Sequence, residues 1–156
     1  MENLKEIVIP KENAVFWMDG NGRWHNVHGP FQHKKLIDYF NTSIGRDPDG
    51  FFVSQERGDV HEKVYFRCEE TALFGVEVLN SNELIVILNT KERIKLDPEK
   101  LFIKNDYLFM HYQDTFIKFT DRCMMWLSTY IEEIGEKYFF SHGGKNIPIK
   151  TASVEC

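Results

Sequence analysis

The sequence predicts an α+β fold in which a strand, helix, strand unit occurs twice around a β-rich, mainly antiparallel middle. Two stretches, 31–44 and 121–134, carry apolar residues at helical spacing. Each stretch leads into a short aromatic run that is typical of a strand. Between the two stretches, short β-prone runs alternate with turn residues, which is the pattern of antiparallel strands.

The first residues predict a β-hairpin. Residues 6–9 and 14–18 are β-prone, and the Asp-Gly-Asn-Gly sequence at 19–22 favours the positive φ angles of a tight reversal. Residues 24–27 then return as the second strand of the hairpin.

A helix is expected next, over residues 31–44. Pro30 suits the first turn of a helix, where its missing N–H costs nothing, and Gly45 suits a C-terminal cap. A turn at 46–50 and an aromatic strand at 51–55 follow.

The second helix is expected over residues 121–134. Thr120 is a good N-cap, and Gly135 stands where a helix would end. The apolar stripe of this predicted helix consists of Met124, Leu127, Ile131 and Ile134. A last strand is expected over 138–141.

The two helical stretches also align with each other. When Phe52 is placed on Phe139, the identical pairs are Thr42 with Thr129, Ile44 with Ile131, Phe52 with Phe139, and Ser54 with Ser141. We interpret this alignment as an internal repeat, although shared helix and strand patterning alone would also produce it.

These elements predict four segments: an N-terminal α+β unit at 1–58, a β-rich middle at 59–104, a C-terminal α+β unit at 105–150, and a tail at 151–156. The segments form either one compact chain or two small subdomains. With 156 residues, of which 42% are hydrophobic and 14% aromatic, the chain has enough apolar material for its own core.

Charge and apolar run length exclude two classes of partner. The formal net charge is −5, which disfavours nucleic acid held by phosphate contacts. The longest apolar runs are far shorter than the ~20 residues that a helix needs to cross a bilayer, so we expect no membrane partner.

The cysteines indicate the compartment. Cys68, Cys123 and Cys156 are odd in number and widely spaced, which favours free thiols in a reducing environment over a disulfide framework. No secretory signal is recognisable, so we expect a cytoplasmic location.

A ligand-binding cleft is one hypothesis for the polar residues that follow the aromatic strands. If the repeated units face each other, such residues would rim a cleft. The candidates are Trp24, His28, Gln55, Glu56, Arg57, Arg67 and Glu70. Ordinary surface ion pairing is the alternative interpretation for these charges.

Three histidines, His25, His28 and His33, raise the alternative of a metal site. They lie within nine residues, yet they fall in a strand, a turn and a helix start, so nothing in the spacing requires them to converge. We therefore predict no metal and no cofactor.

The sequence contains no catalytic motif. A phosphate loop, a Gly-x-Ser-x-Gly elbow and a His-Glu-x-x-His pattern are all missing. The prediction therefore leans away from an enzyme, and the alternative is a small enzyme that uses His28 with a carboxylate such as Glu56.

Several runs resemble a family of bacterial proteins known as domain of unknown function 1285 (DUF1285). The similar residues are Trp24, Pro30-Phe31, Lys35-Leu36, Phe40, Ser43-Ile44, Asp49-Gly50-Phe51-Phe52-Val53, Glu70-Thr71-Ala72-Leu73-Phe74 and Leu88-Asn89-Thr90. The resemblance implies an α+β protein with repeated motifs and a role in signalling or ligand sensing, and it supplies no catalytic residues.

Taken together, these observations predict a non-catalytic bacterial protein that binds a ligand or another protein in a regulatory or signalling role. The partner would be a small molecule or a protein. Whether the chain forms a homodimer stays open.

Overall fold

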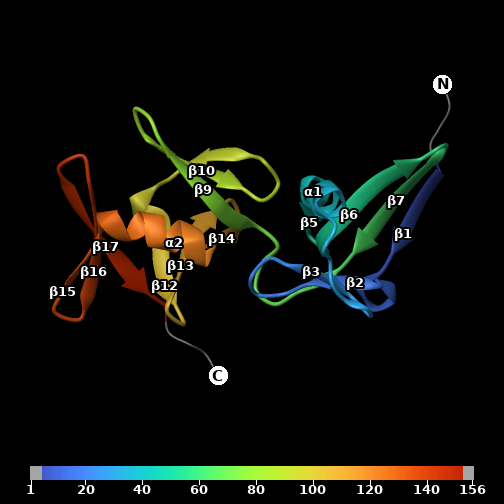
Figure 1. Ribbon diagram of the computed structural model, residues 1–156, viewed down its shortest axis with the longest axis horizontal. Coiled ribbons are helices and arrows are strands. Elements are labelled where there is room, and N and C mark those ends of the chain that lie inside the picture. The colour runs from blue at the N-terminus through green and yellow to red at the C-terminus, as the bar shows by residue number, and fades with distance from the viewer. Residues whose placement is uncertain (1–4, 153–156) are drawn as a thin grey trace. The chain divides into compact units, whose positions relative to one another are not determined.

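The computed structural model describes residues 5–152 and divides into two compact units, Met1–Ala72 and Leu73–Cys156 (Figure 1). The division falls inside the stretch 59–104, which the sequence assigns to a β-rich middle. Every strand pairing among the described residues lies within one unit, so each unit has its own hydrogen-bonded sheets.

The fold is mostly β, and the predicted α+β class is wrong. Strands contain 54% of the described residues and helices only 17%. Two α-helices occur among these residues, together with seventeen strands. The predicted strand, helix, strand units are also wrong, because each helix is followed by a meander of three strands.

The first unit contains two four-stranded sheets, ordered β1-β7-β6-β5 and β4-β3-β2-β8. Its elements are β1 (Lys5–Ile9), η1 (Lys11–Asn13), β2 (Phe16–Met18), β3 (Trp24–Asn26), β4 (Gly29–Pro30), α1 (Lys34–Thr42), β5 (Ile44–Asp47), β6 (Gly50–Arg57), β7 (Val60–Tyr65) and β8 (Arg67–Cys68). Neighbouring strands are antiparallel except for β1 with β7 and β2 with β8.

An aromatic cluster connects β3 to α1 in this unit. Trp24 is 1% exposed. Its ring contacts the rings of Phe16, Phe31, Phe40 and Phe66. The indole Nε1 donates a hydrogen bond of 2.8 Å to Oδ1 of Asn41 on the helix, so the buried N–H is satisfied.

The predicted hairpin is confirmed. Strands β2 and β3 pair antiparallel across the turn at 19–22. Oδ1 of Asp19 accepts hydrogen bonds from the backbone N–H groups of Asn21 (2.8 Å) and Arg23 (3.0 Å), which fixes the turn.

The first predicted helix is confirmed with narrower limits, since α1 runs over Lys34–Thr42. Pro30 lies in β4 rather than in the first helical turn, and Gly45 lies in β5 rather than at a cap. A Cβ atom on Gly45 would stand 2.5 Å from the ring of Phe52, so close packing of this ring on the backbone accounts for the glycine.

The second unit contains a nine-stranded sheet ordered β11-β10-β9-β14-β13-β12-β17-β16-β15. Its elements are β9 (Phe74–Asn80), β10 (Leu84–Leu88), β11 (Arg93–Lys95), η2 (Pro98–Lys100), β12 (Leu101–Lys104), β13 (Tyr107–Tyr112), β14 (Thr115–Phe119), α2 (Asp121–Leu127), η3 (Ser128–Tyr130), β15 (Ile131–Ile134), β16 (Lys137–His142) and β17 (Lys145–Thr151). Two pairs are parallel, β14 with β9 and β12 with β17, and the others are antiparallel.

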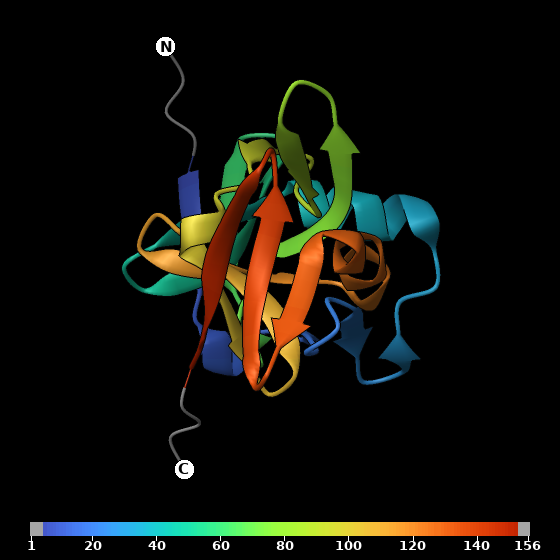
Figure 2. The ribbon, with the colours of Figure 1, turned by 90° about the vertical axis from the view of Figure 1, so that its left-hand side faces the viewer.

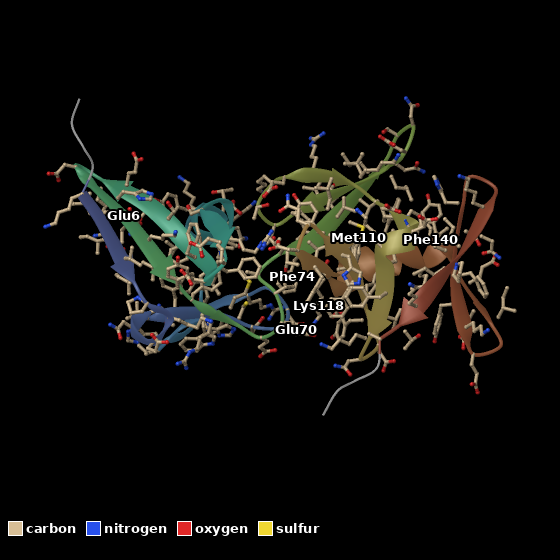
Figure 3. All side chains as sticks on the ribbon, turned by 180° about the vertical axis from the view of Figure 1, so that it is seen from behind. Glu6, Glu70, Phe74, Met110, Lys118 and Phe140 are labelled. Atoms are coloured by element: carbon tan, nitrogen blue, oxygen red, sulfur yellow. The ribbon has the colours of Figure 1, made fainter. Side chains whose placement is uncertain are left out.

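The core of the second unit lies between this sheet and α2, whose buried residues are Cys123 and Leu127. Figure 3 labels two other buried side chains of the unit, Met110 and Phe140. Cys68 and Cys123 are free thiols, as the sequence predicts, whereas Cys156 lies outside the described residues. The predicted tail at 151–156 overlaps β17, which runs to Thr151, and its last four residues lie outside the described part.

The second predicted helix is wrong in its latter half. Helix α2 ends at Leu127, one 3-10 turn follows, and Ile131–Ile134 forms β15, which pairs with β16. Figure 2 shows β15, β16 and β17, coloured orange to red, as neighbouring strands of one meander. Gly135 has a φ of +66° in the turn between β15 and β16, so it reverses a hairpin rather than ending a helix.

Candidate functional site

A pocket of about 470 Å³ lies in the first unit, beside the parallel strands β2 and β8. We call it the β2–β8 pocket. Its lining includes Lys11, Phe16, Trp17, Met18, Arg67 and Cys68. Glu12 and Glu69 are exposed and also border it.

The short strand β8 positions the cationic side of this pocket. In the pairing of β2 with β8, Trp17 is opposite Arg67 and Met18 is opposite Cys68. Because opposite residues on paired strands project from the same face, the indole and the guanidinium group stand on one side of the sheet. The 3-10 turn η1 supplies Lys11 from the segment that precedes β2.

The indole of Trp17 is held in place although it is 40% exposed. It stacks on the imidazole of His25, with ring centroids 5.8 Å apart and an angle of 8° between the planes. Nε2 of His25 is in turn 2.7 Å from Oδ2 of Asp19. The turn at 19–22 therefore fixes His25, and His25 fixes the orientation of the exposed ring.

Asp19 stays ionised in this arrangement. Burial raises the pKa of its carboxyl group, but hydrogen bonds from His25 and from the backbone of Arg23 and Asn21 outweigh that effect, so the pKa is lowered from its ordinary value. An ionised carboxylate accepts the hydrogen bond, which makes Nε2 of His25 the donor.

Two cations at the pocket have no ion pair within residues 5–152. Lys11 comes from η1 and Arg67 from β8, and neither lies within salt-bridge distance of a carboxylate there. Unpaired cations next to an exposed aromatic ring provide both charge and a stacking surface for a ligand.

Cys68 is the thiol of this pocket, and it is a weak nucleophile. Burial raises its pKa, and the nearby ammonium group of Lys11 offsets this only in part. The thiol is therefore protonated near neutral pH, whereas nucleophilic attack requires the thiolate.

A separate polar cluster lies on the β5–β7 sheet. Oδ2 of Asp47 accepts hydrogen bonds from Nζ of Lys63 and from the hydroxyl of Tyr65, both at 2.6 Å. Oγ of Ser54 is 2.8 Å from Nε2 of His61. The hydrogen bonds of Asp47 reach from β5 across β6 to β7, and that of Ser54 joins the paired strands β6 and β7. Such contacts are typical of residues that hold a sheet together.

Electrostatics agree with this structural role. The hydrogen bond from Lys63 lowers the pKa of Asp47 most, the one from Tyr65 adds to it, and the resulting pKa is about 2. The Lys63 ammonium group also lies 4.3 Å from the centroid of the Phe52 ring.

The structure separates the residues that the sequence nominates for ligand binding. Arg67 lines the β2–β8 pocket. Trp24 belongs to the buried aromatic cluster, His28 is exposed in a turn, and Glu70 is half-buried just beyond β8. Of the residues predicted to rim one common cleft, Arg67 is the one that lines the β2–β8 pocket.

Gln55, Glu56 and Arg57 lie at the far end of β6. Nε2 of Gln55 donates to Oε1 of Glu62 at 3.0 Å, and Nη2 of Arg57 is 3.6 Å from the same oxygen. Glu62 precedes Arg67 by five residues, which is roughly 17 Å of extended chain. Glu56 is exposed, and neither a hydrogen bond nor an ion pair within residues 5–152 joins it to His28.

The three histidines of the metal hypothesis occupy different elements. His25 is in β3, His28 is in a turn, and His33 is the exposed N-cap residue of α1. In the part of the chain that the structure describes, no three His, Cys, Asp or Glu side chains gather closely enough to hold a metal ion.

The sequence does not single out Lys11, Trp17 or Cys68 as site residues. They meet Arg67 only because β2 pairs with β8, about fifty residues further along the chain. For the polar cluster on the β5–β7 sheet the sequence does contain a recognisable pattern, since His61, Lys63 and Tyr65 alternate along β7 and so share one face.

None of the helices within residues 5–152 is long and apolar enough to cross a membrane. No protein-family model matches the chain, and no curated protein matches its sequence.

Two solved structures are similar to this chain. A DUF1285 family protein from Silicibacter pomeroyi DSS-3 matches with a TM-score of 0.63 and 13% identity, over 94% of this chain and 84% of that one. A DUF1285 family protein from Shewanella baltica OS155 matches with a TM-score of 0.54 and 14% identity, over 76% of this chain and 94% of that one. The resemblance found in the sequence is thus confirmed at the level of structure, and the chain has the fold of the DUF1285 family proteins.

Proposed function

We propose that this protein binds a small planar organic anion in the β2–β8 pocket and acts by binding rather than by catalysis. The observation that carries the proposal is the exposed indole of Trp17, held by His25 beside two cations, Lys11 and Arg67. An aromatic carboxylate is the simplest ligand with matching chemistry.

Each part of such a ligand has a counterpart in the pocket. A volume of about 470 Å³ lies within the range of small-molecule sites. A flat ring stacked on Trp17 gains about 0.5–1.5 kcal/mol beyond the burial of its area. The guanidinium group of Arg67 has the fork geometry that receives a carboxylate through two hydrogen bonds.

The state of Cys68 favours binding over covalent chemistry. Its raised pKa leaves the thiol protonated, so this group packs against a ligand instead of attacking it. A binding protein of this kind suits a regulatory or signalling role, in which occupancy of the pocket is the signal.

The test is a titration with 2-naphthoate, in which binding is measured by calorimetry and by the thermal shift of the protein. We expect saturable binding of one molecule per chain and a rise in melting temperature with ligand concentration. Replacing Arg67 by alanine should weaken binding at least about tenfold, because the charged hydrogen-bonding partner is lost. Trp17→Ala should weaken it by a similar factor.

Two matched variants control for charge and for exposed aromatic surface. Arg57→Ala removes an exposed arginine far along β6, and Tyr39→Ala removes an exposed ring from α1, so both should bind like the wild type. The proposal fails if 2-naphthoate and related aromatic acids do not bind, or if Arg67→Ala and Trp17→Ala bind as well as these controls.

A further inference from the structure

A second and larger pocket lies within the other unit. It has a volume of about 610 Å³ and is bordered by the start of β10, the turn η2, and the strands β16 and β17. We call it the β16–η2 pocket. Its apolar lining consists mainly of aliphatic side chains, Leu84, Leu96, Pro98 and Ile147, with the ring of Phe140.

One wall of this pocket is fixed before any ligand arrives. The ring of Tyr130 stacks on Phe140 at 5.7 Å between centroids and meets the imidazole of His142 edge-on at 5.2 Å. The hydroxyl of Tyr130 accepts a hydrogen bond of 3.2 Å from Nδ2 of Asn80. Phe140 is 1% exposed, and Figure 3 labels it in the second unit. This aromatic wall would therefore need little further ordering when a ligand binds.

Some charged side chains around the pocket form an ion pair or a hydrogen bond, and others do not. Nζ of Lys95 is 3.0 Å from Oε2 of Glu83, and the carboxylate of Asp97 accepts the backbone N–H of Glu99 at 3.1 Å. Lys100 and Lys145 have no ion pair within residues 5–152.

Glu99 and His142 are two further polar groups of the lining. The exposed carboxylate of Glu99 is also on the rim, and it is the only carboxylate of the lining that engages neither an ion pair nor a cap in the described residues. His142 is the strand partner of Lys145 across the turn between β16 and β17, which adds a third nitrogen group to the basic side. The lining therefore contains three lysines and three carboxylates, and two of the lysines, Lys100 and Lys145, have no ion pair within residues 5–152 and lie beside the aliphatic floor.

We infer that the β16–η2 pocket binds an aliphatic carboxylate, with its hydrocarbon chain on the floor of leucine and isoleucine and its carboxylate group between Lys100 and Lys145. The aliphatic lining distinguishes it from the β2–β8 pocket, where the exposed surface is an indole ring. The inference stands on a different unit and does not depend on the function proposed for that first pocket.

A chain-length series tests the inference with hexanoate, octanoate and decanoate, titrated calorimetrically into the full-length protein below their micelle concentrations. We expect one saturable site per chain. The affinity should rise with length, by up to about fourfold for each added methylene group, until the floor is covered. A neutral probe, decanol, should bind at least about tenfold more weakly than decanoate because it cannot use the two ammonium groups.

Variants then locate the site. Lys100→Ala combined with Lys145→Ala should weaken decanoate binding at least about tenfold, and Asn82→Trp should block the pocket from its exposed turn. The matched control combines Lys137→Ala with Lys150→Ala, which removes equal charge from β16 and β17 at exposed positions outside the pocket.

The control should bind decanoate like the wild type. The inference is overturned if decanoate does not bind, if its affinity ignores chain length, or if the site variants and the control lose affinity equally. It is also overturned if Asn82→Trp and the double lysine variant both retain full affinity.

Discussion

Asp47 joins two strands of the first unit through a single carboxylate oxygen. That oxygen accepts hydrogen bonds from Lys63 and Tyr65 of β7, while Oδ1 accepts the backbone N–H of Asp49 in the adjacent turn. The sequence places Asp47 inside a turn at 46–50, whereas in the structure β5 ends at Asp47 and β6 begins at Gly50, so the turn is narrower than predicted. The side chain of Asp47 still accepts the turn N–H, which is a local interaction. Its contact with β7 depends on pairing through β6, so no local pattern reveals it.

The pKa of Asp47 makes a prediction about acid stability. Its value in the folded protein is about 2, below the ordinary value of 3.8, so folding favours the ionised form. The resulting stability is fully present above about pH 4 and is lost as the pH falls from about 4 to about 2. The urea midpoint of the wild type should therefore approach that of Asp47→Asn over this range.

Asn at position 47 can still accept the turn hydrogen bond through its amide oxygen, but its amide nitrogen cannot accept from Lys63 and Tyr65. The variant therefore removes the charge of the carboxylate together with the two hydrogen bonds that depend on it. Asp59→Asn, at an exposed position in the turn between β6 and β7, is the control and should follow the wild type throughout. A constant gap between wild type and Asp47→Asn from pH 6 to pH 2.5 would show that the charge of this carboxylate does not stabilise the fold.

The two helices begin differently. Oγ1 of Thr120 accepts the backbone N–H of Cys123 at 3.3 Å and caps α2. His33 occupies the corresponding position of α1, makes no such hydrogen bond, and is followed by no acidic residue in the first turn. The sequence predicts the Thr120 cap correctly because capping is a local interaction.

This difference predicts opposite effects of substitution. Thr120→Ala should lower the free energy of unfolding by about 1 kcal/mol, because one helical N–H loses its partner. His33→Asp should raise it by about 0.5–1 kcal/mol through a new cap and a favourable charge at the helix N-terminus. Urea denaturation measures both.

His28→Asp introduces the same substitution at an exposed turn position outside either helix. It should change stability by less than about 0.5 kcal/mol. If His33→Asp and His28→Asp have the same effect, the missing cap of α1 is not what limits that helix.

The second helix shows why element prediction failed over residues 131–134. Ile131 and Ile134 continue the helical spacing of Met124 and Leu127, but the sequence Ile-Glu-Glu-Ile also suits a strand. Pairing with β16 decides between the two, and Ile134 is 55% exposed on the resulting strand. Ile131 and Ile134 therefore match the spacing of a helical stripe although they lie in a strand.

Over the whole molecule, tertiary pairing rather than local pattern determines the class. Turn residues such as those at 19–22 and the cap of α2 could be predicted, and so could many short strands. The extent of β-structure could not, because it depends on which runs pair, as β12 does with β17 in parallel. The same limit applies to the candidate site, where Trp17 and Arg67 meet only through the pairing of β2 with β8.

Binding of a planar anion against Trp17 can be followed at single residues, because the chain contains three tryptophans. In the protein with ¹⁵N-labelled tryptophan, each indole N–H gives one NMR signal, assigned by single Trp→Phe variants. Trp24 donates its N–H to Asn41 inside the aromatic cluster, and Trp126 lies on α2 in the other unit.

Titration with 2-naphthoate should shift the indole signal of Trp17 in a saturable way and leave the signals of Trp24 and Trp126 essentially in place. A Trp17 signal that stays unchanged at saturating 2-naphthoate would rule out binding against this ring, and so would equal shifts of all three signals.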